Sequence, residues 1–462
     1  MIRKYRYLLT AAAAVGAAGL LTFAARNDFG LGRNMEIAVN MMRELSLNYV
    51  DPVDPDRLME GAAAGMVSDL DPYTEYIPEE GMQDFELLTT GKYGGIGALI
   101  RQKDDYVRIA QPYQGSPADK AGLKIGDKIL SIDGKDAKGF TTEQVSSRLK
   151  GEPGSKVKVT VEHLDGSTET VTLQRERISI PGVPYTGWVA DGIGYIKLGQ
   201  FARTTSAEME QALASLRAEG VTKLIFDLRG NSGGYLDQAI LVANEFLHKE
   251  QLIVYTEDRH HQQQREYADG TGSAQDMDVV VLIDEGSASS SEILAGALQD
   301  NDRGTIVGRR SFGKGLVQRQ IPYSDGSALR LTTARYYTPT GRSIQKPYTI
   351  GDDESYEEDI WNRYRNNEFF SADSIHFADS LKRVTPGGKV VYGGGGIMPD
   401  VFIPADTTDV TKYFVEVAGR NILYRYTIEY ADRHREALNA VKTIDELSLI
   451  HISEPTRRSY IS

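Results

Sequence analysis

The chain has 462 residues, of which 40% are hydrophobic and 25% are charged, and its net charge at pH 7 is −13. This length predicts about two to four domains, and the composition is typical of a folded globular protein. The negative charge argues against a nucleic-acid partner or a general anionic-membrane surface. Because cysteine is absent, disulfides, thiolate catalysis and cysteine-ligated zinc are excluded.

The N-terminus has the pattern of an export signal. Arg3, Lys4 and Arg6 precede an uncharged, mostly apolar run, Leu8–Ala25, and a basic flank before such a run directs export. The run is long for a cleaved signal and short for a transmembrane helix. Residues 1–33 are therefore expected to be either a signal peptide or a retained membrane anchor. We expect an exported protein, in the periplasm or on the extracytoplasmic face of the inner membrane.

Residues 34–90 are expected to form a helical segment. Apolar residues recur there at helical spacing, namely Met35, Ile37, Ala38, Met41, Met42 and Leu45. Pro52 and Pro55 then interrupt the pattern, and a second helix is expected over Arg57–Leu70. Such a stripe is typical of core packing or of a dimer contact, and we expect a homodimer or a higher homo-oligomer.

The pattern changes over residues 91–178. Short runs of alternating character predict a compact domain made mostly of strands, with clear examples at Val157–Val161 and Thr168–Leu173. Turns are expected at Asp133-Gly134 and Asp165-Gly166.

Residues 179–345 alternate apolar strands with helices, which predicts an α/β sheet with parallel strand pairs. The expected strands are Gly194–Leu198, Leu224–Leu228 and Val279–Ile283, and the expected helices are Ser206–Glu219, Tyr235–Phe246 and Ser290–Leu298. Ser206 is the expected N-cap of its helix, and Gly220 its stop.

The C-terminal segment, residues 346–447, begins with a polar stretch, Gly351–Asp379, that is expected to be a loop. A helical pattern covers Asp409–Leu447. Residues 448–462 do not continue this pattern, and we expect them to be a disordered or a non-native tail.

Two loops rich in small residues follow strands of the expected sheet. Residues 284–293 lead into a helix, whose first N–H groups and dipole can stabilise an oxyanion beside a nucleophilic serine. Residues 227–235 follow an earlier strand, and sites in open α/β sheets form beyond the carboxyl ends of strands. Each loop alone is an ordinary tight turn or a serine N-cap, but two of them in one sheet indicate a site.

A nucleophilic serine needs a base. None of the seven histidines lies in a recognisable catalytic motif, so a lysine is the other route, as in Ser-Lys peptidases. Lys314 lies between two glycines and near apolar residues, which favours a desolvated, neutral amine. Residues 316–321 are expected to be extended. On a strand, Lys314 and Gln318 share a face, so that Gln318 can hold the amine by a hydrogen bond.

Several ordered motifs together resemble the C-terminal processing, or tail-specific, serine peptidase family. The resemblance runs from about residue 34 to about residue 400, and its motifs are Asp227–Gly234, Gly286–Ile293, Gln299-Asp300, Phe312–Gly315 with Gln318, and Gly396–Asp400. It implies a crotonase-like or ClpP-like α/β peptidase core. It also implies that Ser289 is the nucleophile, that Lys314 is the general base and that Gln318 positions the lysine.

The same resemblance implies an oxyanion hole made by backbone amides of Gly233, Gly234 and Ser290. The family often has alanine where this chain has Ser290. Because the expected donor is a backbone N–H, this difference should change little. The implied chemistry needs no metal and no cofactor.

Residues 91–178 resemble a PDZ domain, on the segments Tyr93–Gly97 and Gly115–Asp127. Backbone amides in the first segment can form a nest for a terminal carboxylate, and a neighbouring strand edge can take an extended peptide by β-augmentation. The expected tail-binding residues are Gly94, Gly95, Ile96 and Gly97, and the expected partners are the C-terminal tails of proteins or peptides.

The sequence thus predicts a multidomain α/β serine endopeptidase with an inserted PDZ domain and an N-terminal helical segment, which cleaves near the C-termini of exported proteins. One alternative is a catalytically inactive PDZ scaffold, which loss of Ser289, Lys314 or Gln318 would favour, and all three are present. A crotonase-type acyl-CoA enzyme rests on fold analogy alone. Nucleotide binding at residues 308–314 is disfavoured, because Gly315 stands where a P-loop needs Ser or Thr.

Overall fold

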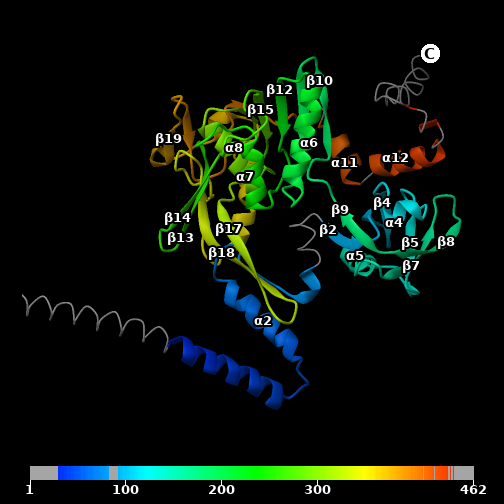
Figure 1. Ribbon diagram of the computed structural model, residues 1–462. Coiled ribbons are helices and arrows are strands. Elements are labelled where there is room, and N and C mark those ends of the chain that lie inside the picture. Colours follow the sequence, from blue (N-terminus) through cyan, green and yellow to red (C-terminus); the bar gives the residue numbers. More distant parts are fainter. Residues whose placement is uncertain are drawn as a thin grey trace, which may run out of the picture. The chain divides into compact units, whose positions relative to one another are not determined.

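The computed structural model describes residues 30–82, 92–408, 410–420, 422–434, 437–438 and 441. The chain divides into two compact units, and Figure 1 labels the helices and strands along it. Unit 1 consists of Met1–Glu79, Arg319–Thr332 and Tyr348–Asp353, and unit 2 of the remaining residues. Most of the expected signal or anchor and the whole of the 448–462 tail lie outside the described residues. In the part of the chain that the structure describes, no helix is long and apolar enough to cross a membrane.

Unit 1 begins with a helix over residues 30–48. Helix α2 (Pro55–Val67) follows, and its N-cap residue Asp54 accepts a hydrogen bond from the Asp56 N–H. Pro55 fits at the start of this helix, because the first helical N–H has no intrahelical acceptor. The helical prediction for residues 34–90 is confirmed over these two elements.

That prediction is wrong at strand β1 (Glu75–Ile77). This strand pairs antiparallel with Ala328–Arg330, more than 250 residues away along the chain, and it buries Ile77. A partner so distant in sequence leaves no trace in local periodicity, which explains the error. Residues 83–90 of the same segment lie outside the described residues.

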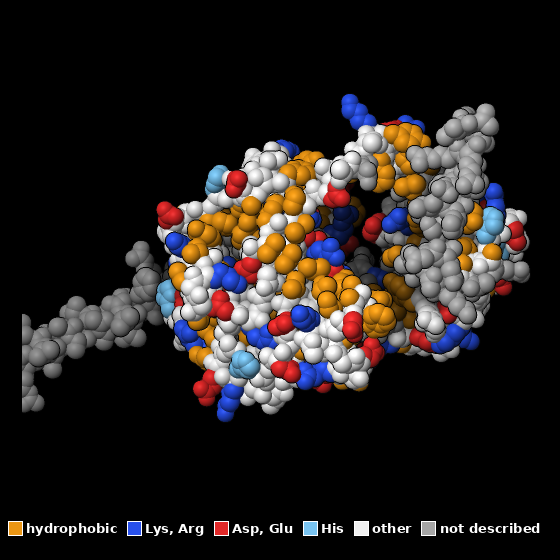
Figure 2. All heavy atoms as spheres, turned by 90° about the horizontal axis from the view of Figure 1, so that it is seen from above, with side chains coloured by type: hydrophobic (Ala, Val, Ile, Leu, Met, Phe, Trp, Pro, Cys, Tyr) orange, Lys and Arg blue, Asp and Glu red, His pale blue; other side chains and the backbone are white. Residues whose placement is uncertain are grey.

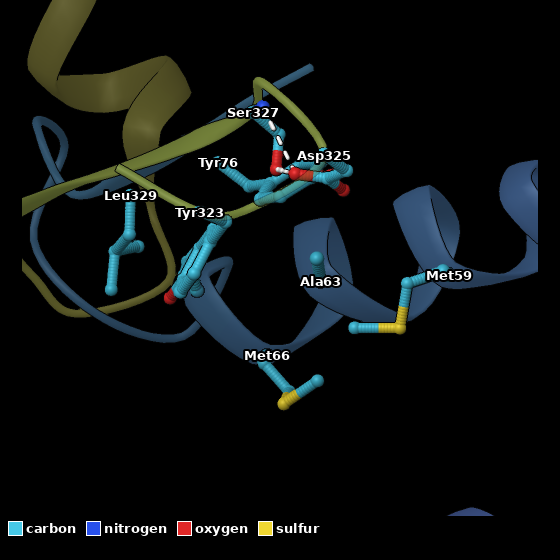
Figure 3. Close-up of a pocket in the computed structure, with 9 residues that line it drawn as sticks. Met59, Ala63, Met66, Tyr76, Tyr323, Asp325, Ser327 and Leu329 are labelled. Atoms are coloured by element: carbon cyan, nitrogen blue, oxygen red, sulfur yellow. Dashed lines mark hydrogen bonds between the residues drawn. The ribbon is translucent and has the colours of Figure 1, made fainter. Parts of the chain in front are cut away.

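An apolar pocket of about 250 Å³ lies within unit 1. Figure 3 shows Met59, Ala63 and Met66 of α2 lining it together with Tyr323 and Leu329 of the hairpin formed by β17 (Leu316–Pro322) and β18 (Ala328–Tyr337). The helix at residues 30–48 also exposes a set of large apolar side chains, which are Leu31, Met35, Ile37, Val39, Met41, Leu45 and Leu47. Many large apolar side chains of unit 1 are therefore exposed.

The β-rich domain that precedes the core in the chain contains a sheet with the strand order β3-β4-β5-β7-β8, and β6 pairs with β5. These strands are β3 (Ala98–Lys103), β4 (Tyr106–Pro112), β5 (Lys128–Ile132), β6 (Lys135–Asp136), β7 (Lys156–Glu162) and β8 (Thr168–Gln174). Two helices, α4 (Pro117–Lys120) and α5 (Thr142–Leu149), join them, and β2 (Lys92–Gly95) pairs with β9 (Glu176–Ser179). Alternate residues such as Val157, Val159 and Val161 fill the core, as expected for strands with one buried face.

The α/β core is built on a six-stranded sheet with the order β10-β11-β12-β15-β16-β21. The strands are β10 (Tyr185–Ala190), β11 (Ile193–Lys197), β12 (Lys223–Asp227), β15 (Asp278–Ile283), β16 (Thr305–Gly308) and β21 (Val401–Phe402). All neighbours from β11 to β21 are parallel, and β10 is antiparallel. The expected α/β sheet with parallel pairs is confirmed.

Three helices connect these strands: α6 (Thr205–Ala218), α7 (Leu236–Asn244) and α8 (Ser290–Asp300). Helix α6 begins one residue before Ser206, so Ser206 is not its N-cap as expected, while Gly220 follows its end with a φ of 79°. Every residue of α8 is buried. A helix surrounded on all sides is held rigidly, which suits it to carry a catalytic residue at its N-terminus.

A second sheet contains β13 (Leu252–Asp258) and β14 (Gln263–Tyr267), with β13 pairing to the second half of β18. The expected loop at 351–379 is wrong in part, because it contains helices α9 (Asp353–Glu357) and α10 (Asp359–Arg365). The remaining elements are short: η1 (Glu79–Gly81), η2 (Ala372–Ser374), η3 (Asp379–Leu381), β19 (Lys382–Val384), β20 (Val390–Tyr392), α11 (Lys412–Gly419) and α12 (Ile422–Arg433). The last two confirm the helical pattern after residue 409.

Figure 2 shows one face of the molecule, on which acidic and basic side chains are interspersed with patches of apolar ones. The fold is the predicted multidomain α/β architecture, with an α/β core, a β-rich domain placed before it in the chain and helices at the N-terminus. In the core, the carboxyl ends of β12 and β15 are adjacent because the two strands pair in parallel. The loops that follow them, residues 228–235 and 284–289, therefore meet at one edge of the sheet.

Candidate active site

The turn between β15 and α8 holds Ser289 in an unusual backbone conformation. Its φ is 54° and its ψ is −115°, a region that residues with a side chain rarely adopt. Such conformations cost free energy and cluster at functional sites. Ser289 is half-buried and immediately precedes the first residue of α8. The positively polarised N-terminus of this helix therefore lies beside Ser289.

The other three serines of this segment use their hydroxyl groups to hold the neighbouring loop. Ser287 Oγ donates to the Leu228 carbonyl, Ser290 Oγ to the Gly234 carbonyl and Ser291 Oγ to the Asn231 carbonyl, each at 2.9 Å. These hydrogen bonds tie the turn after β15 to the loop after β12. Of the four serines, Ser289 therefore remains the candidate nucleophile on geometric grounds as well.

The glycine loop after β12 approaches Ser289 closely. Gly233 has a φ of +106°, and a Cβ atom placed on it would lie 2.7 Å from the Ser289 Cβ and 3.0 Å from the Ser290 nitrogen. Only glycine fits at such a position. The structure thus brings together Gly233, Ser289 and Ser290, the residues around the expected oxyanion hole.

Asn231 organises this loop, and the sequence reasoning did not single it out. Its Nδ2 donates to the Leu198 carbonyl at 3.0 Å, and its Oδ1 accepts from the Gly233 N–H at 2.9 Å. The Gly233 N–H would have to leave Asn231 before it could bind an oxyanion. Ser290, as the first residue of α8, has an N–H for which helix geometry provides no acceptor.

Asp227 anchors the start of the same loop. Its buried carboxylate accepts hydrogen bonds from the Arg229 side chain at 2.8 and 3.0 Å, and from the Tyr195 hydroxyl at 2.6 Å. Burial alone would raise the pKa of Asp227, but hydrogen bonds from Arg229 and Tyr195 and the charge of Lys197 outweigh it and lower this pKa to about 2. The carboxylate therefore stays ionised at neutral pH and fixes the loop.

Glu292 links the nucleophile to the loop that carries Lys314. Its Oε2 accepts from the Ser289 N–H at 2.9 Å and from the Lys314 N–H at 2.8 Å. Its Oε1 accepts from the Gly313 N–H at 2.7 Å and from the Ser311 hydroxyl. One buried carboxylate thus sets the distance between the backbones of the two expected catalytic residues. The sequence motif contained Glu292, but nothing local distinguished it from an ordinary helical glutamate.

Tyr336 makes a second link between the same two residues. Its hydroxyl lies 3.1 Å from the Ser289 carbonyl oxygen and also within hydrogen-bond reach of the Lys314 carbonyl oxygen. The residue is almost completely buried. Glu292 therefore binds the N–H groups of Ser289 and Lys314, and Tyr336 lies between their carbonyl groups.

Lys314 lies in a loop, because β17 begins only at Leu316. In a strand, alternate side chains point to the same face, and this was the reason to expect Lys314 and Gln318 on one face. Lys314 lies outside the strand, so this reason does not apply to it. Lys314 and Gln318 are both half-buried, and Leu316 between them is buried. The position of the lysine is fixed by the hydrogen bonds of its loop, and its pairing with Gln318 stays a prediction.

Replacing Glu292 with glutamine should lower kcat by roughly 10²-fold, the cost of misplacing a catalytic group by about 1 Å. If the glutamine amide nitrogen took the place of Oε2, it would face the N–H groups of Ser289 and Lys314, which now donate to that oxygen. A nitrogen that is itself a donor cannot accept these two hydrogen bonds, so both would break. The rate of tail-peptide cleavage per folded protein measures this effect. A variant that cleaves at the wild-type rate would show that the Glu292 link does not matter for catalysis.

The same variant tests the charge of Glu292. Burial raises the pKa of its carboxyl from 4.5 to about 7. Between these values the unfolded chain releases the proton while the folded chain keeps it, so the contribution of Glu292 to stability falls as pH rises and levels off above about 7. The melting temperature of the wild type relative to Glu292→Gln should therefore decline from pH 4.5 to pH 7. A difference that rises over this window would contradict the shift.

The expected tail-binding residues lie at the start of the β-rich domain, in β2 and directly after it. Gly94 and Gly95 belong to β2 and pair with Arg177 and Glu176 of β9, and a Cβ on Gly94 would lie 2.1 Å from the Gly151 carbonyl oxygen. The Gly97 carbonyl accepts from the Ser116 hydroxyl at 2.8 Å, and Ile96 is buried. Among the described strands of this sheet, β3 comes first in the order and pairs only with β4. Its other edge has no strand partner among the described residues.

Comparison with known families identifies the class. The model of peptidase family S41 matches residues 192–355, the PDZ domain model matches residues 108–163, and the model described as activating protease CtpB N-terminal domain matches residues 31–81. These matches cover the core that carries Ser289 and Lys314, the β-rich domain and the helices of unit 1. The chain is therefore an S41-type peptidase chain with a PDZ domain.

Individual relatives show to which family within this class the chain belongs. A carboxy-terminal-processing protease of Bartonella bacilliformis is 38% identical over 312 residues, which are 66% of this chain and 71% of that protein. A probable CtpA-like serine protease of Staphylococcus aureus is 34% identical over 331 residues, 70% of this chain and 66% of that protein. The chain thus matches just under two thirds of the length of the S. aureus relatives. It belongs to the carboxy-terminal-processing protease family, and the resemblance found in the sequence is confirmed.

Solved structures of related proteins include a photosystem II D1 C-terminal processing protease. It is 29% identical, with 81% of this chain and 89% of that chain covered and a TM-score of 0.43. The PDZ domain of a carboxy-terminal protease from Vibrio cholerae, solved in complex with a peptide, is 34% identical. The match covers 19% of this chain and 99% of that chain, with a TM-score of 0.18.

Proposed function

We propose that this chain is a serine endopeptidase of the Ser-Lys type, which binds the C-terminal tails of exported proteins through its PDZ domain and cleaves peptide bonds near them. The observation that carries the proposal is the double link between Ser289 and Lys314, through the Glu292 carboxylate and the Tyr336 hydroxyl. It holds a serine at a helix N-terminus at a fixed distance from a lysine-bearing loop.

In this mechanism the neutral Lys314 amine takes the proton of the Ser289 hydroxyl while Oγ attacks the carbonyl carbon of the substrate. The oxyanion that forms is held by backbone N–H groups of Ser290 and of the Gly233-Gly234 turn, after the Gly233 N–H has left Asn231 Oδ1. Lys314 then gives the proton to the leaving amine, and water hydrolyses the acyl-enzyme with the same lysine as base. Gln318 holds the amine in place. No step requires a metal or a cofactor.

The main alternative is a catalytically inactive scaffold that only binds tails. A fluorophosphonate probe separates the two proposals, because it reacts covalently with an activated serine and not with an ordinary one. Mass spectrometry should find the label on Ser289 in the folded protein. Absence of label on Ser289 in folded protein, together with tight binding of tail peptides, would favour the scaffold.

Tail recognition should depend on the free carboxylate of the peptide. A nest of backbone N–H groups around Gly94–Gly97 binds an anion through its partial positive charges. Amidating the C-terminus of a peptide removes this anion and should weaken its binding to the full chain by at least 10-fold, measured by isothermal titration with Ser289→Ala to prevent turnover. Equal affinity of the acid and amide forms would exclude this mode of docking.

We also propose that the protein is exported and forms a homodimer or a higher homo-oligomer through unit 1. The support is the N-terminal basic and apolar pattern for export, and for assembly the exposed apolar side chains of helix 30–48 and the apolar pocket shown in Figure 3. A second copy would cover these surfaces. Light scattering of the purified chain measures its mass and tests the assembly.

A further inference from the structure

A cluster of buried charges lies behind the lysine-bearing loop and takes no part in the mechanism above. Lys346 and Arg363 are 2% and 3% exposed, and both contact one carboxylate, Asp359. The Lys346 Nζ lies 3.2 Å and the Arg363 Nε lies 2.9 Å from the same oxygen, Asp359 Oδ2. Burying two cations against one anion is costly. Such an arrangement persists where the charged groups make further specific contacts.

The further contacts of Arg363 are with the loop that carries Lys314. Its Nη1 donates to the Ser311 carbonyl at 2.7 Å, and its Nη2 donates to the Phe312 carbonyl at 2.8 Å. The planar guanidinium thus binds two consecutive carbonyl groups with two parallel donors, a geometry that a lysine cannot reproduce. Arg363 comes from α10, in the segment that the sequence suggested was a loop.

Lys346 holds the same loop from a neighbouring position. Its backbone N–H donates to the Gly313 carbonyl at 2.9 Å. Its Nζ donates to the Tyr356 carbonyl at 2.8 Å and lies 4.3 Å from the centre of the Phe312 ring and 3.9 Å from that of Tyr356. The cation is therefore held between two aromatic faces, one on the loop and one on α9.

These contacts complete the hydrogen bonding of the loop. The N–H groups of Gly313 and Lys314 go to Glu292, and those of Ser311 and Phe312 go to the Ile397 and Ser287 carbonyls. The carbonyl groups are bound by Arg363, Lys346 and Tyr336. Every backbone polar group of residues 311–314 therefore has a partner. Glu292 holds the N–H groups of Gly313 and Lys314, and Arg363 holds the carbonyl groups of Ser311 and Phe312.

We propose that Arg363 is a positioning residue for the general base, which it serves by fixing the backbone of residues 311–312 through their carbonyl groups. In this arrangement α10 acts as a brace, with Asp359 orienting the guanidinium. The proposal rests on the proposed function, because it takes Lys314 to be the base. Without Arg363, two buried carbonyl groups lose their donors, and the loop is free to move Lys314 away from Ser289.

The test compares Arg363→Lys and Arg363→Gln with Arg365→Gln. Arg365 lies on the same helix but is exposed, and its side chain donates a hydrogen bond to Asn362 Oδ1, so its variant controls for a change of charge on α10. We expect both Arg363 variants to lower kcat per titrated active serine by roughly 10- to 100-fold, with KM for a tail peptide changed by less than about 3-fold. The acidic limb of the kcat/KM pH profile should move as well, because the environment of the base changes. Arg365→Gln should match the wild type.

A purely structural role would lower the fraction of titratable serine and leave kcat per titrated site and the pH profile unchanged, and this result would overturn the proposal. If Arg363→Gln does not fold, the decision passes to Arg363→Lys and to Asp359→Asn, which keeps the guanidinium and removes its anchor. Wild-type kcat per site in both would equally overturn it. Lys314→Arg is assayed in parallel: activity there refutes the proposed function itself, whereas an inactive Lys314→Arg beside normal Arg363 variants refutes only the brace.

Discussion

Ser289→Ala should abolish cleavage of a tail peptide. The other serines of this turn use their hydroxyl groups as hydrogen-bond donors to the loop after β12, so none of them can replace the lost nucleophile without breaking that loop. Residual hydrolysis from an intact oxyanion hole alone should be lower by several orders of magnitude, as found when a member of a catalytic triad is removed. Measurement of kcat with a fluorogenic tail peptide gives the size of the loss.

Ser287→Ala and Ser291→Ala are the matched controls. Each removes one hydrogen bond to the loop, from the hydroxyl to the Leu228 or the Asn231 carbonyl. Ser287→Ala also removes the hydrogen bond that this hydroxyl accepts from the Asp284 N–H. Each variant should cost about 1–3 kcal/mol of stability. Both should nevertheless retain measurable activity, because neither hydroxyl attacks the substrate. Full activity in Ser289→Ala would remove the basis of the mechanism, and complete loss in a control that is folded would mean that the serine was assigned wrongly.

Lys314→Arg should be inactive, although it preserves the positive charge. A general base must be neutral to accept a proton, and a free lysine with a pKa near about 10.4 is almost fully protonated at neutral pH. Partial burial beside Phe312 and the buried Leu316 disfavours the cation, whereas a guanidinium stays protonated in any such site. In the wild type, kcat/KM should therefore rise with pH through an ionisation well below that of free lysine.

The pH profile of kcat/KM and the rate of Lys314→Arg together decide this point. Lys314→His keeps a group that can be neutral, and a trace of activity is expected from it. Binding of a tail peptide to the PDZ domain is the control, since it should be the same in all three proteins. If the arginine variant cleaves at a near wild-type rate, Lys314 serves only as a positive anchor and another residue is the base.

The sequence by itself determined the class of protein and the chain segments that form the site. Apolar strands alternating with helices predicted parallel pairing, and parallel pairing places the loops after β12 and β15 at one edge of the sheet. Their composition, rich in glycine and serine, indicated a site at that edge. These properties are local, because periodicity and turn residues act over a few neighbouring positions. The ordered motifs, taken together, indicated the peptidase family to which the chain belongs.

Only the tertiary structure decided which side chains hold the two catalytic segments together. Tyr336 meets Ser289 across 47 residues of chain, and Arg363 meets Phe312 across 51. Both are polar or amphipathic residues that usually lie at least partly in water, and here they are buried because specific carbonyl groups accept their hydrogen bonds. The segment around Arg363 looked like a loop for the same reason. Burial of a charged residue depends on a partner elsewhere in the fold, and a local pattern of residues does not contain that partner.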